Sequence, residues 1–173
     1  MRGANRKTDI FLQPGDHFVG GDGYRIRTLL GSCVSITLWH PATRTGAMSH
    51  FLLSRRGEFA AAETEADGRY GEEALTLMLR ELRHAGVRTT ECQAKIFGGG
   101  NMFPDRATAN VLDIGRRNGE TARALLQLHR IPIVSESLFG AGHRQVVFDI
   151  ESGHVWSRQV HPADPFRRGG SPT

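Results

Sequence analysis

Residues 33–53 read CVSITLWHPATRTGAMSHFLL, and this stretch predicts a β-hairpin. Apolar and polar side chains alternate from Cys33 to Trp39, which is the two-residue period of a strand with one buried face. A proline within residues 40–44 suits a turn, and a second apolar run occupies residues 46–53. The thiol shares its strand face with serine and threonine and not with the valine, isoleucine and leucine of the other face. This placement is unusual for a purely structural cysteine.

The length of the turn decides whether Cys33 meets His50 across the hairpin. A turn at residues 40–43 would place the two directly opposite, with Cβ atoms about 5 Å apart. A turn at residues 41–44 would make them diagonal neighbours on one face at about 7 Å, and an odd-length turn would separate them. An adjacent imidazole would lower the pKa of the thiol and could later protonate a leaving amine. The alternative is that the thiol is a small core side chain.

Beyond the hairpin, the sequence predicts two helices and four more strands. Apolar side chains recur at helical spacing over residues 75–85, and Gly86 follows where a helix end favours a left-handed residue. A second helix is predicted over 119–129, with Asn118 as its N-terminal cap. The further strands are predicted at 93–97, 133–137, 145–150 and 155–160. Strands first and last with two helices between them predict a mixed α/β fold, a single-domain layered sandwich with a mixed β-sheet.

Length and composition fit one globular domain. The chain has 173 residues, of which 39% are hydrophobic and 23% charged. We expect a flexible leader at 1–9, the domain at 10–161 and a disordered tail at 162–173, since both ends are poor in apolar residues. No run approaches the roughly 18 apolar residues of a membrane span, and no signal peptide is visible, so we expect a cytoplasmic protein. The net charge of +4 is scattered, which argues against a nucleic-acid binder.

Residues close to the hairpin in sequence could complete a site. The hydroxyl of Thr28 could accept a hydrogen bond from the ring nitrogen of His50 that faces away from the thiol. A threonine here could equally be an ordinary strand residue. The backbone N–H groups of Ser32 and Cys33 could stabilise an oxyanion. Small residues at this point, including Gly31, would let a substrate amide approach closely.

A glycine triplet follows the third predicted strand. Gly98, Gly99 and Gly100 form either a second wall of the cleft or a turn with positive φ, and the residues alone do not separate the two interpretations. Asn101 and Arg144 are polar candidates for lining the cleft, and each could equally be a capping or surface residue.

Cysteine and histidine spacing argues against a metal site. With two cysteines, Cys33 and Cys92, the chain has neither a disulfide framework nor a C-x-x-C pair for zinc. Cys92 opens a predicted strand, and we expect it to be buried and inert. The histidines other than His50 lack the spacing of metal ligands. The chemistry we predict therefore needs no cofactor.

Six motifs along the chain resemble those of one family. The hairpin motifs are TLLGSCV at 28–34 and GAMSHFLL at 46–53. The others are LQPGD at 12–16, AKIFGGGNMF at 94–103, IGRRN at 114–118 and GHR at 142–144. Together they resemble CheD, the chemoreceptor glutamine deamidases of bacterial chemotaxis. Asp16 stands where that family more often has glutamate, and we expect no effect on the chemistry from this difference.

The resemblance implies a cysteine hydrolase that converts selected receptor glutamines to glutamate. Cys33 would be the nucleophile, His50 the general base and acid, and Thr28 the residue that orients the ring. A spacing longer by one residue, as in some relatives, would move this third role to Arg27. The implied fold is similar to the catalytic domain of cytotoxic necrotizing factor toxins.

The resemblance also implies partners. These are methyl-accepting chemotaxis receptors, whose cytoplasmic regions are helical bundles, and a CheC-type phosphatase. By the same chemistry the protein could hydrolyse a methyl ester. The alternative function is that of an adaptor, which docks to receptors or to the phosphatase with weak or no catalysis.

Overall fold

Strands begin and end the chain, and two helices lie between them. The structure is a computed structural model that describes residues 6–57, 65–104 and 113–160. In chain order the elements are β1 (Thr8–Phe11), β2 (His17–Gly20), β3 (Tyr24–Leu30), β4 (Val34–His40), β5 (Thr45–Ser49), α1 (Gly71–His84), the 3₁₀ turn η1 (Thr89–Glu91), β6 (Gln93–Gly98), α2 (Asp113–Leu128), β7 (Ile133–Leu138), β8 (His143–Asp149) and β9 (Val155–Val160).

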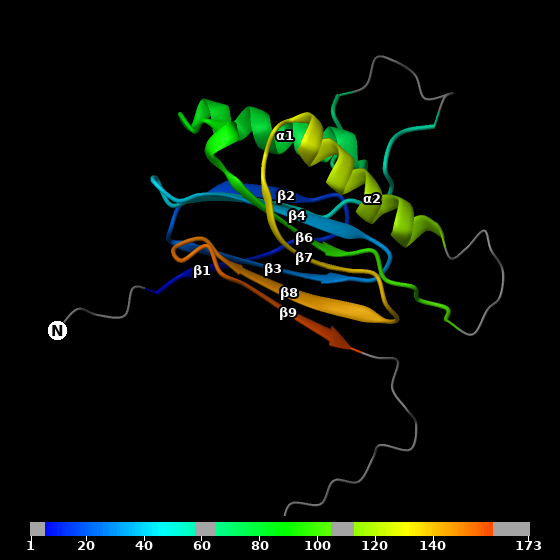
Figure 1. Cartoon of the computed structure of the whole chain (residues 1–173). Coiled ribbons are helices and arrows are strands. Elements are labelled where there is room, and N and C mark those ends of the chain that lie inside the picture. The colour runs from blue at the N-terminus through cyan, green and yellow to red at the C-terminus, as the bar shows by residue number, and fades with distance from the viewer. Residues whose placement is uncertain (1–5, 58–64, 105–112, 161–173) are drawn as a thin grey trace, which may run out of the picture.

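The elements form three layers (Figure 1). Helices α1 and α2 cover one face of a five-stranded sheet with the order β2-β5-β4-β6-β7. The other face of this sheet packs on a four-stranded sheet with the order β1-β3-β8-β9. Both sheets are mixed, because β6 pairs with β7 in parallel and β1 with β3 in parallel while the other pairs are antiparallel. The predicted layered α/β sandwich is thus confirmed.

Strand alternation divides the buried side chains between two cores. On β4, the face of Val34, Ile36 and Leu38 packs against the helices. The opposite face, which begins with Cys33, packs against residues of β3 and β8 in the second core between the sheets. The thiol is therefore directed into the layer between the two sheets, at the end where β4 begins.

The hairpin has the register predicted for a turn at residues 41–44. His40 pairs with Thr45, so the turn consists of residues 41–44. The same register continues past the end of β5, where Val34 and Phe51 exchange two backbone hydrogen bonds of 3.0 and 3.1 Å. Cys33 is thereby opposite Leu52, and His50 is its diagonal neighbour on the same face.

Helix α2 corrects the prediction for Asn118. The helix begins at Asp113 and not near residue 119, so Asn118 lies inside it and is 1% exposed. The first turn has no apolar periodicity, which is why the sequence pattern missed it. Packing stabilises this first turn instead, because Gly115 lets the helix approach the glycine triplet closely. A Cβ at Gly115 would lie 2.6 Å from the Gly99 carbonyl oxygen.

The beginning of the chain also differs from the prediction. Thr8 and Asp9 belong to β1, so this part of the predicted leader is a strand and not flexible. Lys7 binds the carboxylates of Asp149 and Glu151, each at 2.7 Å. Residues 1–5 of the leader and the predicted tail at 162–173 lie outside the described residues. Across the described part of the chain, no helix combines the length and apolar character needed to cross a membrane.

Candidate active site

Thr28 and His50 meet between the two sheets. Thr28 projects from β3 in the four-stranded sheet, and its Oγ1 lies 2.7 Å from Nδ1 of His50, which follows β5 in the other sheet. The same hydroxyl donates to the Leu12 carbonyl at 2.9 Å. Because a hydroxyl has one proton, Thr28 must accept from Nδ1–H, and the ring's Nε2 carries the free lone pair. The contact selects the tautomer that a general base requires.

The segment at 12–16 holds the histidine from the other side. The His50 backbone N–H donates to the Asp16 carbonyl at 3.0 Å, and the Gly15 N–H donates to the His50 carbonyl at 2.8 Å. Leu12 from the same segment accepts the Thr28 proton. This N-terminal motif therefore fixes both the backbone and the ring of His50. Arg27, the alternative third residue, is instead paired with Asp9, at 3.2 Å, and has no contact with the ring.

Burial makes both reacting groups neutral at rest. Desolvation lowers the pKa of His50 to about 4, although the nearby Asp16 carboxylate and the Leu12 carbonyl favour the charged ring. Burial likewise raises the pKa of the Cys33 thiol, and its own backbone amide only partly offsets this. The expected lowering of the thiol pKa is thus wrong for the resting site.

Residues 31–33 form the loop before β4, here called the cysteine loop. All three of its backbone carbonyls accept hydrogen bonds. Gly31 O accepts from Gly100 N–H at 2.9 Å, and Cys33 O accepts from Gly99 N–H at 2.9 Å. Ser32 O accepts from the side chain of Asn118 at 3.1 Å. Within the three described ranges, the N–H groups of Ser32 and Cys33 donate to no other residue. These two amides remain available for a negative charge that develops beside the sulfur.

The glycine triplet forms a turn packed against backbone. Gly98 and Gly99 have φ of 110° and 65°. A Cβ at Gly98 would lie 2.2 Å from the Cys33 carbonyl oxygen, and one at Gly100 would lie 2.6 Å from the Gly142 carbonyl oxygen. The amides of Gly99 and Gly100 are already used to hold the cysteine loop. The geometry therefore confirms the turn, and the wall of the cleft stays a prediction.

Comparison with known proteins places the chain in a family. The family model described as CheD chemotactic sensory transduction matches residues 52–159. The chain belongs to the CheD family. It is 60% identical to "Probable chemoreceptor glutamine deamidase CheD 2" of Albidiferax ferrireducens, over 94% of this chain and 93% of the relative. It is 45% identical to "Probable chemoreceptor glutamine deamidase CheD 3" of Dechloromonas aromatica, over 90% of each.

A solved structure also aligns with this CheD-family chain. It is the hypothetical protein YfiH of Bacillus licheniformis, with a TM-score of 0.44 and 15% identity over 70% of this chain and 50% of the other. That likeness is too distant to support a statement about the site. The predicted similarity to cytotoxic necrotizing factor toxins stays a prediction.

Two further polar candidates of the CheD motifs make hydrogen bonds to the backbone. The Oδ1 of Asn101 accepts the Phe103 N–H at 2.9 Å, and its backbone bridges to Ala141. Arg144 is 3% exposed and donates to the carbonyls of Gly98, Ser137 and Phe139. Neither side chain contacts Cys33 or His50 in the described part of the chain. Arg144 instead links the glycine turn to the end of β7. The glycine turn then holds the cysteine loop through the N–H groups of Gly99 and Gly100.

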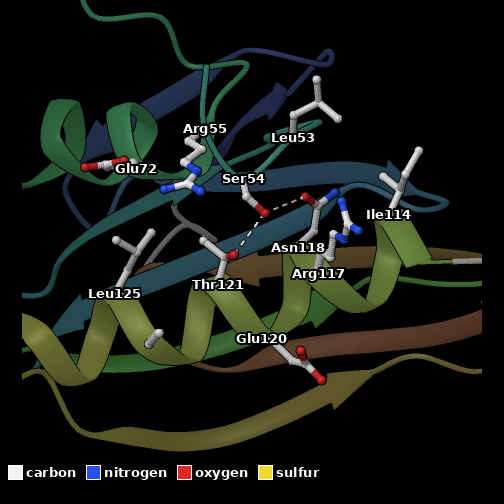
Figure 2. A pocket seen from close by; sticks show the side chains of 11 residues that line it. Leu53, Ser54, Arg55, Glu72, Ile114, Arg117, Asn118, Glu120, Thr121 and Leu125 are labelled. Atoms are coloured by element: carbon white, nitrogen blue, oxygen red, sulfur yellow. Dashed lines mark hydrogen bonds between the residues drawn. The ribbon is translucent and has the colours of Figure 1, made fainter. Parts of the chain in front are cut away.

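A groove of about 730 Å³ lies on the helix side of the cysteine loop (Figure 2). Its floor includes Asn118 of α2, whose side chain also binds the Leu52 carbonyl at 2.7 Å. Leu53 and Ile114, which are 46% and 39% exposed, form its apolar rim. Sequence reasoning missed this groove because Asn118 was interpreted as a helix cap.

The second cysteine is isolated from the site. Cys92 is fully buried in the core under the helices, and burial, with a smaller contribution from Glu91, raises its thiol pKa to about 11. Among the described residues, no group of three or more cysteine, histidine or acidic side chains is placed to hold a metal ion.

We predict that iodoacetamide labels Cys33 before Cys92 in the native protein. Cys33 is partly exposed whereas Cys92 has no access to solvent. Because the Cys33 pKa is raised, the labelling rate should increase with pH through neutrality and into the alkaline range. Peptide mapping by mass spectrometry identifies the labelled thiol, and urea-unfolded protein, in which both thiols react, serves as the control. Faster labelling of Cys92 in the native state would refute the assignment.

Proposed function

We propose that this CheD-family chain deamidates glutamine side chains of chemoreceptors through a thioester on Cys33. The observation that carries the proposal is the bond from His50 Nδ1–H to Thr28, because it leaves Nε2 as a base on the strand face that Cys33 shares. The relatives' names supply the substrate: they are called chemoreceptor glutamine deamidases. The geometry supports the chemistry of a cysteine hydrolase.

The first half-reaction forms the thioester. His50 Nε2 takes the proton of the Cys33 thiol, and the sulfur attacks the side-chain carbonyl carbon of the glutamine. The electron pair of the C=O bond moves to oxygen, and the N–H groups of Ser32 and Cys33 stabilise this oxyanion. When the oxyanion collapses, the C–N bond breaks. The leaving nitrogen takes the proton from His50 and departs as ammonia.

The second half-reaction restores the enzyme. His50 removes a proton from a water molecule, whose oxygen attacks the thioester carbon and forms a second oxyanion at the same position. Collapse breaks the C–S bond, and the sulfur takes back its proton from His50. The net change is one glutamine and one water converted to one glutamic acid and one ammonia. A γ-methyl ester would follow the same route, with methanol as the leaving group.

Thr28 acts through the ring. Its hydroxyl oxygen accepts the Nδ1 proton at 2.7 Å and so keeps Nε2 directed away from the hydroxyl, toward the reacting side of the ring. Unlike a carboxylate, it adds no negative charge, which fits a resting ring with a pKa of about 4. The charged ring that forms in each half-reaction is stabilised by the carboxylate of Asp16.

The test is incubation with a purified cytoplasmic fragment of a methyl-accepting chemotaxis receptor. We expect the mass increase of an amide-to-acid conversion at specific glutamines, located by tandem mass spectrometry, together with release of ammonia. The Cys33→Ala variant is the control for spontaneous deamidation. Stable binding of the fragment without ammonia release would instead indicate the adaptor function. Docking to a CheC-type phosphatase stays a prediction.

A further inference from the structure

Asn118 uses both of its amide hydrogens on the two strands that carry the proposed catalytic pair. The side chain extends from α2, is 1% exposed, and donates to Ser32 O at 3.1 Å and to Leu52 O at 2.7 Å. Ser32 directly precedes Cys33, and Leu52 is the residue opposite Cys33 in the hairpin register. One side chain therefore clamps both strands at the level of the nucleophile.

The orientation of this amide is fixed by its neighbours. Its Oδ1 accepts from Ser54 Oγ at 3.3 Å, and Ser54 Oγ in turn accepts from Thr121 Oγ1 at 2.9 Å. Figure 2 shows these two hydrogen bonds on the floor of the groove. A flipped amide would place its oxygen against two carbonyl oxygens, which only accept hydrogen bonds. The nitrogen of Asn118 must therefore face the cysteine loop.

Of the three hydrogen bonds that hold the loop carbonyls, the bond from Asn118 acts on the peptide that matters for the oxyanion. The carbonyl of Ser32 and the N–H of Cys33 belong to the same peptide group. Fixing that carbonyl fixes the direction of the N–H, and a hydrogen bond to the carbonyl also strengthens the N–H as a donor. The other two donors, Gly99 and Gly100, are backbone amides that hold the neighbouring peptides.

We propose that Asn118 is a positioning residue for the oxyanion site, which it serves by orienting the Ser32–Cys33 peptide while holding the strand of His50 at a constant distance. The inference rests on the proposed function, since it assigns a role within that reaction. Asn118 touches neither the substrate nor the sulfur in this account. It acts through the backbone, from the opposite side of the sheet to the thiol.

The test compares two reactions of the same thiol. Alkylation by iodoacetamide needs the Cys33 sulfur but forms no oxyanion, whereas deamidation forms one twice. Asn118→Ala should lower kcat for deamidation of the receptor fragment by about 10²-fold, the usual effect of losing one oxyanion donor. The KM and the rate of Cys33 alkylation should change little. Circular dichroism and the thermal midpoint show whether the variant is folded.

A second variant and a control complete the design. Asn118→Leu keeps about the size and branched shape of the side chain but has no N–H donor and no charge, so it should show the same separation of the two reactions even if Asn118→Ala does not fold. Glu120→Gln, an exposed substitution on the rim of the same groove, should leave both reactions unchanged.

The outcomes separate this inference from the proposed function. A wild-type protein that labels at Cys33 but does not deamidate overturns the proposed function and this inference with it. If the wild-type protein deamidates and the Asn118 variants retain its kcat, the inference alone is wrong. It is also wrong if deamidation and alkylation fall in parallel, because Asn118 would then be a structural residue without a specific effect on the oxyanion.

Discussion

His50→Ala should reduce deamidation by roughly 10⁴- to 10⁶-fold, as loss of the base does in related hydrolases. Burial raises the pKa of the Cys33 thiol, so the proposed reaction depends on a base that takes its proton. Cys33→Ala should be equally damaging, because no thioester can form. The double variant should be little worse than either single one, since the two residues act as a unit. Initial rates of ammonia release with the receptor fragment measure all three.

Matched substitutions make this result specific. Thr28→Ser keeps the hydroxyl that accepts from the ring and should keep most of the activity, whereas Thr28→Val has similar volume without that hydroxyl and should lose activity. His154→Ala changes an exposed histidine that packs edge-on against Trp156, and it should have no effect. Near-normal turnover by His50→Ala would show that the hairpin does not form a catalytic Cys–His pair.

The hairpin could be predicted because its information is local. Strict alternation fixed the face of Cys33, and only a few turn lengths were sterically reasonable, so the pairing with His50 reduced to a small choice of registers. The structure selected the register with His40 opposite Thr45. The helix ending before Gly86 was equally local, and this glycine has a φ of 82°.

The parts that could not be predicted depend on long-range contacts. The first two strands have four residues each, and β1 is stabilised by pairing with β3 and by Lys7 contacting Asp149, which is 142 residues away. The first turn of α2 exists because Gly115 fits against the glycine turn. Asn118 was therefore interpreted as the cap of a helix that in fact begins at Asp113, and its contact with Ser32 could not be foreseen.

The protonation state of the site was also beyond the sequence. A cysteine next to a histidine suggests an ion pair, but the outcome depends on how completely the fold removes water from both groups. Here His50 is 3% exposed and lies between two sheets. Desolvation therefore outweighs the attraction between the charged forms at rest. In the proposed reaction, the ion pair is a transient species.

Gly98→Ala should cause the largest loss of stability among the glycine substitutions, and a matched variant isolates the reason. Gly86 and Gly98 both have positive φ, so an alanine at either position pays the penalty of a left-handed conformation, about 1–2 kcal/mol. At Gly86 the new methyl group would meet nothing within 4 Å. At Gly98 it would lie 2.2 Å from the Cys33 carbonyl oxygen, and relieving that overlap should add about 1–3 kcal/mol more.

Urea unfolding followed by circular dichroism measures both free energies of unfolding. Because the Cys33 carbonyl accepts the Gly99 N–H, the displacement at Gly98 should also move the nucleophile, so any Gly98→Ala protein that remains folded should deamidate poorly. Gly86→Ala, at the far end of α1, should keep full activity. Equal losses of stability in the two variants, with activity retained in both, would mean that the cysteine loop moves freely away from the glycine turn, which would contradict the supporting role assigned to that turn.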